Sequence, residues 1–188
     1  TVLAFASLLL KAAAQGSPLR QMGDEAATAQ AKDLMARMAA WAFEQPESAA
    51  AGFQLLGCMA PVQASPALTW NEATPELRKA AIKALSWVNE PALRDPAACF
   101  LSGVLRWNTP GNQRLAEVDP GLWQAVEEAR RKVMAEGTPQ AQVQVLIGIA
   151  EGQDAEARGP SAQEIQRRLH AGHVPPDLRV AASNALSR

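Results

Sequence analysis

The chain has few of the residues from which catalytic and metal sites are usually built. Its 188 residues include two histidines, two cysteines and no tyrosine, and only 5% of them are aromatic. The sequence contains no nucleophile elbow, zinc-protease helix, phosphate-binding glycine loop or dinucleotide fingerprint. We therefore expect a protein that is not an enzyme and that uses no cofactor.

The two histidines, His170 and His173, are the weak candidates for a metal site. Neutral imidazole is a common metal ligand, and the two side chains are close in sequence. However, Gly172 interrupts the helix that would fix their geometry, and no Cys, Asp or Glu follows at a recognisable ligand spacing. We expect them to be exposed loop residues and predict no metal site.

The chain also lacks an excess of charge of either sign. Lys and Arg together number 18 and Asp and Glu 19, so the formal net charge is -1. Nonspecific binding of nucleic acid rests on an excess of cations that neutralise phosphates. We therefore expect no nucleic-acid partner.

Cys58 and Cys99 both lie among apolar residues, where a thiol behaves as a small hydrophobe. Two cysteines in a chain of this length do not form a disulfide framework. Their environment favours a reducing cytoplasm as the location of the protein.

A hydrophobic run long enough to span a membrane is absent as well. The apolar segment Val2–Leu10 is interrupted by Lys11 and is shorter than the roughly 18 residues that a span needs. No positively charged region precedes it, as a signal peptide would require. We expect a first helix that is buried or covered by a partner. The alternatives are a trimmed signal or, since the chain starts at Thr1, a fragment of a longer protein.

What the chain has in abundance is alanine, at roughly one residue in five, and alanine is the best helix former. Val and Ile, which strands prefer, are sparse. With 48% hydrophobic residues, the chain can bury a sizeable core without disulfides or metal. We predict a single all-α domain over residues 1–188.

Capping residues followed by proline mark several helix starts, as at Asp119-Pro120 and Thr138-Pro139. Gly137 predicts a left-handed stop between two antiparallel helices, and Ser161 with Glu164 predicts a capping box. We expect about nine antiparallel helices in an orthogonal bundle or a short irregular solenoid. The predicted ranges are Val2–Ala14, Asp24–Gln45, Glu47–Met59, Pro75–Val88, Pro96–Trp107, Pro120–Glu136, Pro139–Glu151, Ala162–His170 and Pro176–Ser187.

Apolar side chains recur at helical spacing in these ranges, which indicates the faces that are buried. One stripe is Leu77, Ala81, Ala84, Leu85 and Val88, and another is Leu122, Val126, Ala129 and Val133. The range Pro139–Glu151 is apolar over a wider arc, so we predict that it is the most buried helix.

One internal similarity stands out. The windows Pro75–Ser86 and Pro176–Ser187 agree at Pro, Leu, Arg, three Ala, Leu and Ser, and Pro91-Ala-Leu-Arg94 repeats their start. The pattern resembles the second helix of HEAT-like repeats, which stack into a curved solenoid that binds other proteins. The resemblance implies that Arg78 and Arg179 are structural arginines between repeats. Any well-capped alanine-rich helix gives the same pattern, so both interpretations stay open.

The stretch from Ala84 to Ala125 is similar in rhythm to an uncharacterised bacterial family of helical proteins. The similarity rests on Ala-Leu-Ser-Trp87-Val, Ala98-Cys-Phe-Leu-Ser-Gly103 and Val118-Asp-Pro-Gly-Leu. It implies a bacterial source and no particular activity.

The five tryptophans are the remaining candidates for function. Trp41, Trp87 and Trp123 lie in or next to periodic helical stretches, so we expect them in the core. Trp70 lies in a long connection and Trp107 ends a helix, and loop tryptophans often anchor partners. Trp70 and Trp107 are therefore the predicted partner-binding residues, although each could instead cover the core at a helix end.

The sequence favours a non-catalytic protein-interaction module, scaffold or adaptor whose partner is another protein. The alternative is a ligand-binding protein or enzyme with a pocket between helices that uses Cys58, Cys99, or the pair His170 and His173. A third possibility, compatible with the first, is an accessory region whose segment Val2–Leu10 packs on a part of a larger protein.

Overall fold

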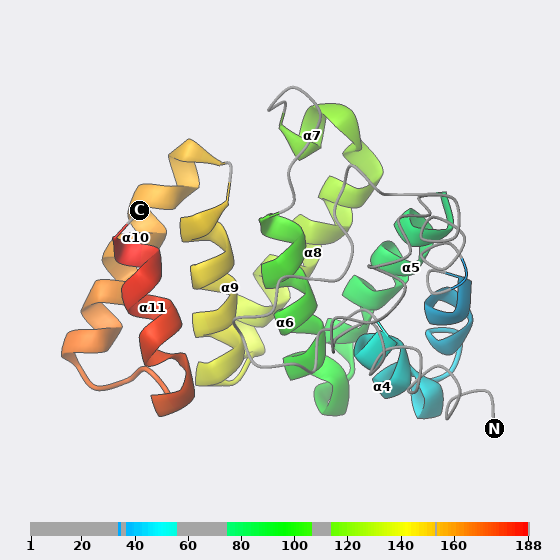
Figure 1. The fold of residues 1–188 in the computed structure, drawn as a ribbon, viewed down its shortest axis with the longest axis horizontal. Helices are drawn as coiled ribbons and strands as arrows, with labels where there is room; N and C mark the ends of the chain where they lie inside the picture. The colour runs from blue at the N-terminus through cyan, green and yellow to red at the C-terminus, as the bar shows by residue number, and fades with distance from the viewer. Residues whose placement is uncertain (1–33, 35–36, 56–74, 107–113, 153, 188) are drawn as a thin grey trace, which may run out of the picture.

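The computed structural model describes Leu34 and residues 37–55, 75–106, 114–152 and 154–187. These residues form helices and short connections and contain no strand, so the all-α prediction is confirmed (Figure 1). Leu34 and residues 37–42 are helical. The elements that follow are α4 (Pro46–Leu55), α5 (Pro75–Ser86), η2 (Trp87–Asn89), η3 (Pro91–Leu93), α6 (Arg94–Leu105), α7 (Leu115–Val118), α8 (Pro120–Glu136), α9 (Pro139–Glu151), α10 (Ala155–His170), η5 (Pro176–Leu178) and α11 (Arg179–Leu186).

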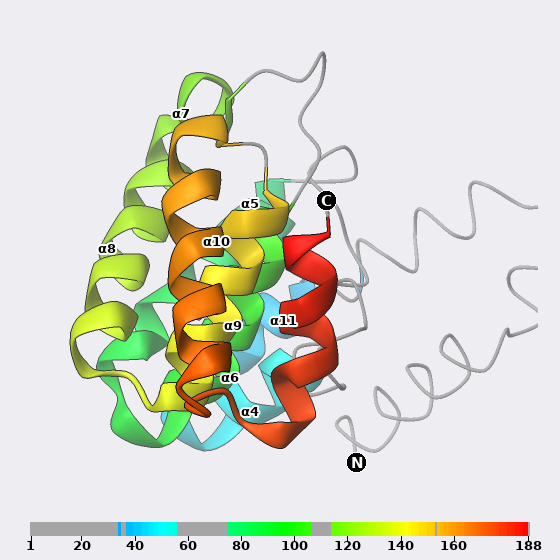
Figure 2. The same ribbon diagram turned by 90° about the vertical axis from the view of Figure 1, so that its left-hand side faces the viewer.

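The helices follow one another along the long axis of the molecule, from α4 and α5 at one end to α10 and α11 at the other (Figure 1). In one row, α4 contacts α6, α6 contacts α9, and α9 contacts α11. On the other side α5 contacts α8, and α10 packs on α9 (Figure 2). Successive long helices run in opposite directions, so this part of the chain is an elongated stack of antiparallel helix pairs.

The predicted bounds of α8 and α9 agree with the structure because both helices begin at a capping residue followed by proline. The side chain of Asp119 accepts from the Leu122 N–H at 3.1 Å, and that of Thr138 accepts from the Ala141 N–H at 3.1 Å. The predicted left-handed conformation of Gly137 is wrong, since its φ of -72° and ψ of 158° are extended. Glycine suits the position for another reason: a Cβ there would lie 2.5 Å from the Val133 carbonyl oxygen.

The corner between α8 and α9 is bonded to the start of α6. The Arg94 guanidinium donates to the Glu136 carbonyl at 2.9 Å and lies 3.3 Å from the Glu136 carboxylate. The Thr138 hydroxyl donates to the Asp95 carboxylate at 2.8 Å. These contacts join the loop of one helix pair to the first turn of the neighbouring pair.

The start of α10 differs from the prediction by about two turns. We expected a connection over residues 152–159 and a helix from Ala162, but the helix begins at Ala155 and contains Pro160. The Asp154 carboxylate accepts from the N–H groups of Glu156 and Ala157, which caps the helix before the predicted capping box. Ala157 then packs against the core, which favours a helix in this stretch.

Other predicted bounds shift by shorter steps. The range expected to be one helix to Val88 ends at Ser86 and continues as η2, and the final helix is divided into η5 and α11. The helix expected from Pro96 begins at Arg94. The short helix α7 lies in what we expected to be a connection.

Both predicted apolar stripes are buried, and α9 is buried on nearly all sides, as predicted. Its Ala141, Val145 and Ile149 belong to a large hydrophobic cluster, the first core cluster, that extends through α8, α6 and α5 to residues 37–55. Its Val143, Leu146, Ile147 and Ala150 belong to a smaller cluster with α10 and α11. The helix therefore supplies side chains to two cores.

The contact between α6 and α9 is unusually close. A Cβ on Gly148 would lie 2.7 Å from both the Cα and the carbonyl oxygen of Ser102. One turn later, a Cβ on Gly152 would lie 2.7 Å from the Leu105 carbonyl oxygen. The two glycines allow the backbones of α6 and α9 to approach each other.

Within the described ranges, no helix combines the length and the apolar character that crossing a membrane requires.

Candidate functional site

The most exposed large hydrophobic side chain among the described residues is Trp41, which we expected in the core. This residue is 62% exposed, so that prediction is wrong. The helix of residues 37–42 instead buries Ala39 and Ala42, and Phe43 follows with its ring 4.9 Å from that of Phe53. The core therefore takes the small residues and Phe43, and the opposite face carries Trp41 to the surface.

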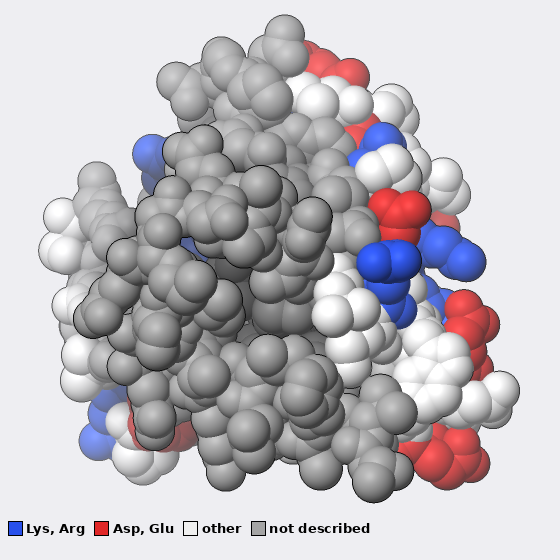
Figure 3. All heavy atoms as spheres, turned by 45° about the vertical axis from the view of Figure 1, so that its right-hand side comes forward, with Lys and Arg blue, Asp and Glu red and all other residues white. Residues whose placement is uncertain are grey.

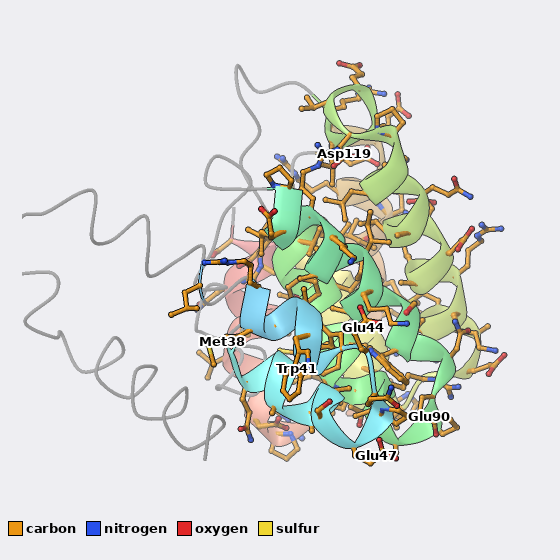
Figure 4. The ribbon with its side chains drawn as sticks, turned by 90° about the vertical axis from the view of Figure 1, so that its right-hand side faces the viewer. Met38, Trp41, Glu44, Glu47, Glu90 and Asp119 are labelled. Atoms are coloured by element: carbon orange, nitrogen blue, oxygen red, sulfur yellow. The ribbon has the colours of Figure 1, made fainter. Side chains whose placement is uncertain are left out.

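Trp41 belongs to an apolar stripe. Leu34, Met38 and Trp41 are separated by four and three residues, the spacing that places side chains on one face of a helix. Leu34 is 41% exposed, and Met38 is half-buried against the first core cluster. Figure 4 shows Met38 and Trp41 side by side on this face. In this stripe, Met38 is held in place by packing against the core, whereas the indole of Trp41 projects from the surface.

Three exposed glutamates accompany this stripe: Glu44, Glu47 and Glu90 (Figure 4). The Glu44 N–H donates to the Trp41 carbonyl at 3.1 Å, so this residue ends the turn that Trp41 begins. Glu47 lies in the first turn of α4, where the helix dipole favours a negative charge. Glu90 lies between η2 and η3, and its N–H donates to the Trp87 carbonyl.

None of these three carboxylates has an ion-pair partner within the described part of the chain, although eight other ion pairs occur there. We name the six residues Leu34, Met38, Trp41, Glu44, Glu47 and Glu90 the Trp41 surface. It is an exposed indole on a partly fixed apolar stripe, with unpaired negative charges at one side.

Cations also lie near this surface. A groove of about 510 Å³ runs between the helix of residues 37–42 and α5, and its walls include Glu44, Lys79, Ile82 and Lys83. The Lys83 ammonium lies 5.6 Å from the centre of the Trp87 ring, which gives it a cation–π contact. Figure 3 shows both signs of charge on the described atoms of this side of the molecule. Lys79 and Lys83 lie on α5, whereas Glu47 lies in α4 and Glu90 directly precedes η3 (Figure 4).

The predicted partner-binding residues Trp70 and Trp107, and also Cys58, lie outside the described residues. Cys99 is half-buried, and burial raises the pKa of its thiol although Arg106 opposes the shift. Its thiol is therefore protonated at neutral pH, unlike that of a reactive cysteine.

His170 is the last residue of α10, and His173 follows in the turn at Gly172, whose φ is +72°. Both imidazoles are exposed. The described residues bring no group of three His, Cys, Asp or Glu side chains close enough to hold a metal ion.

The two arginines of the internal similarity have different partners. Arg78 joins α5 to α8, because its Nε donates to the buried Asp119 carboxylate at 2.7 Å. Arg179 instead donates to the Val174 carbonyl at 3.3 Å, five residues before it. Arg94 makes a contact of the second kind, to the Val88 carbonyl at 2.9 Å.

Trp87 and Trp123 are half-buried against the first core cluster. Trp123 also lines a pocket of about 170 Å³ where the ends of α6 and α9 meet α7, α8 and the start of α10. Apolar side chains form most of its wall, with Arg114 and Arg130 beside them. Neither Cys99 nor either histidine is among the described residues that line it, so these residues offer no nucleophile and base in one place.

Comparisons with family models, with curated proteins and with solved structures found no match to this chain. The resemblance to HEAT-like repeats therefore stays a prediction, and a functional proposal has to rest on the geometry of the Trp41 surface.

Proposed function

We propose that the chain is a non-catalytic protein-interaction module, a scaffold or adaptor, that holds its partner at the Trp41 surface. The observation that carries this proposal is a tryptophan that is 62% exposed next to a methionine packed on the core. Tryptophan is enriched among the residues that dominate binding energy, because it buries a large area at a small entropic cost. An apolar stripe with a polar rim is the usual anatomy of such an interface.

The stacked helix pairs support the same proposal, since stacks of helix pairs commonly present extended binding surfaces. A HEAT-like origin of the pairs is part of the proposal. In its favour, Pro91–Arg94 and Pro176–Arg179 share a local structure: a 3-10 turn, a buried leucine and an arginine that opens an α-helix. We place the module in a bacterial cytoplasm, because its two cysteines lie among apolar residues and form no disulfide framework, and because part of the sequence is similar in rhythm to a bacterial family.

The test is affinity capture from the native host lysate with the full chain in three forms: wild type and the variants Trp41→Ala and Val180→Ala. Val180 is a matched control, because it is 59% exposed on α11 at the opposite end of the stack. We expect one specific partner to be retained by wild type and Val180→Ala. With Trp41→Ala, we expect its dissociation constant to rise about 30-fold or more.

Circular dichroism should show that all three variants are equally helical. Capture of the same proteins at equal strength by all three would contradict the proposal. A fourth variant, Trp70→Ala/Trp107→Ala, covers the residues predicted first. Loss of the partner in that variant and not in Trp41→Ala would move the interface to those residues.

A second candidate function is binding of a small amphipathic carboxylate, and the pocket beside Trp123 favours it. Val104, Leu105, Leu115 and Ile149 would surround an apolar tail. Arg130 would attract the carboxylate in competition with Glu127, which lies 2.9 Å from it, while Asp154 on the same wall already accepts two N–H groups at the start of α10. Titration calorimetry with octanoate and octanol would test this, with Arg130→Gln as the variant. Saturable binding of octanoate that weakens in the variant supports it, and no binding of either compound at millimolar concentration contradicts it.

A further inference from the structure

We infer that the segment bound at the Trp41 surface is basic: it places apolar side chains on Leu34, Met38 and Trp41, and Lys or Arg side chains on the neighbouring glutamates. This inference rests on the proposed function and adds the chemistry of the partner to it.

The inference follows from the position of the three glutamates and from the absence of an ion-pair partner for each of them among the described residues. Glu44, Glu47 and Glu90 are exposed, and no described cation lies within ion-pair distance of any of them. Glu117, Glu128 and Asp177 also form no ion pair among the described residues, so what distinguishes these three glutamates is their place beside an exposed tryptophan. An acidic partner would meet like charges at this rim, whereas a cationic one would form charge-assisted hydrogen bonds.

Selectivity for a basic segment would have to be local. The net charge of the whole chain is -1, so long-range attraction between this protein and a cation is weak. Arg37 lies at helical spacing from Leu34 and Trp41, and Lys79 and Lys83 share a groove with Glu44, so the negative part of the rim is the side formed by Glu47 and Glu90. The nearby Lys79 and Lys83 lie on α5, so we expect the cations of the partner on the side of Glu47 and Glu90.

The experiment is a selection from a random peptide display library on the immobilised full chain, with removal of peptides that also bind Trp41→Ala. We expect the remaining peptides to combine aromatic or aliphatic residues with an excess of Lys and Arg over Asp and Glu. The Kd of an enriched peptide is then measured for wild type and for the variant Glu44→Gln/Glu47→Gln/Glu90→Gln.

We expect the triple variant to bind roughly 10-fold more weakly than wild type, as three exposed ion pairs of ordinary strength would give. The matched control is Glu117→Gln/Glu128→Gln/Asp177→Asn, which changes the net charge by the same amount at exposed positions on α7, α8 and η5. It should bind within about twofold of wild type. Binding to wild type should weaken from 50 to 500 mM NaCl, and binding to the triple variant should weaken less.

The outcomes separate the two proposals. Peptides that depend on Trp41 but have no excess of cations, or that bind the triple variant as tightly as wild type, would overturn this inference and leave the proposed function intact. A selection that yields no peptide dependent on Trp41 would contradict the proposed function itself.

Discussion

Gly148 is the residue on which the close contact between α6 and α9 depends. In Gly148→Ala the new methyl group would lie 2.7 Å from backbone atoms of Ser102, and backbone cannot move aside as a flexible side chain can. We expect the free energy of unfolding to fall by about 1–3 kcal/mol, the usual cost of overpacking. Urea denaturation followed by circular dichroism measures this change.

Gly159 provides the matched control for that substitution. It lies inside α10, and a Cβ there would meet no atom within 4 Å outside its chain neighbours and the backbone of its own helix. Gly159→Ala should change the free energy of unfolding by less than about 1 kcal/mol, because the higher helix propensity of alanine is opposed by contact of its Cβ with the ring of Pro160. Equal effects of the two substitutions would show that α6 and α9 are not in close contact.

Trp41 shows what a pattern of hydrophobic residues leaves open at the scale of one residue. Residues 38–43 contain two possible apolar faces, one with Met38 and Trp41 and one with Ala39, Ala42 and Phe43. Size alone favours burial of the tryptophan. The structure buries the other face, where Phe43 packs edge to face on Phe53 and Ala39 and Ala42 are fully buried. Which of the two faces is buried depends on the contact between Phe43 and Phe53, and the spacing of apolar residues along one helix does not reveal that contact.

At the scale of elements, Asp119 has two structural roles. It caps α8 through the Leu122 N–H, and it accepts the hydrogen bond from Arg78 that joins α8 to α5. Asn retains a side-chain oxygen that can cap, whereas Ala does not. We expect Asp119→Ala to lose about 1–2 kcal/mol of stability and Asp119→Asn to lose less. Equal losses in thermal or urea denaturation would show that capping is not its main contribution.

The same carboxylate predicts a dependence of stability on pH. Burial acts to raise the pKa of Asp119, but the Arg78 guanidinium and the N–H groups of Leu122 and Gly121 outweigh it and hold the pKa below its ordinary value. A lowered pKa in the folded state stabilises the protein above the unfolded value of about 3.9, and this contribution is lost as pH falls through the folded value. The stability difference between wild type and Asp119→Asn should be constant from pH 7 to 5 and shrink below pH 4. A difference independent of pH would contradict it.

The elements could be predicted from the sequence where the signals are local. Asp119-Pro120 and Thr138-Pro139 determine the starts of α8 and α9, because a cap and a proline act within one turn. The start of α10 could not be predicted in this way. Its true cap, Asp154, competes with a capping-box pattern at Ser161, and packing of Ala157 on the first cluster favours the earlier start. The Trp41 surface could not be predicted either, because it too depends on tertiary structure. Whether Glu44, Glu47 and Glu90 have ion-pair partners is decided by residues that are distant in sequence.

At the scale of the whole molecule, the two hydrophobic clusters predict that stability is uneven along the stack. The cluster of α9, α10 and α11 is the smaller one and is built around Ile165 and Leu178, both fully buried. Native-state hydrogen exchange should show α10 and α11 opening at a lower free energy than α6. Leu178→Ala should lower the free energy of this opening by about 2–5 kcal/mol, the cost typical of such truncations. It should change the free energy of opening of α6 less.

The control for that prediction is Leu101→Ala, which removes a fully buried side chain from the first cluster. It should lower the protection of α6 directly. Equal changes in all helices after Leu178→Ala would instead show that the described part of the chain unfolds as one cooperative unit, with α9 coupling both clusters.

The bonded corner between α8 and α9 has a practical consequence for labelling the protein. Arg94 and Asp95 hold Glu136 and Thr138 in place, so a tag inserted there would separate α6 from its neighbouring helix pair. The turn at residues 171–173 is exposed, and no atom beyond its chain neighbours lies within 4 Å of the Cβ position of Gly172, although the φ of +72° requires that this glycine itself be kept. An epitope or fluorophore is therefore better placed at this turn, which lies at the end of the stack away from Trp41 and leaves that surface free for a partner.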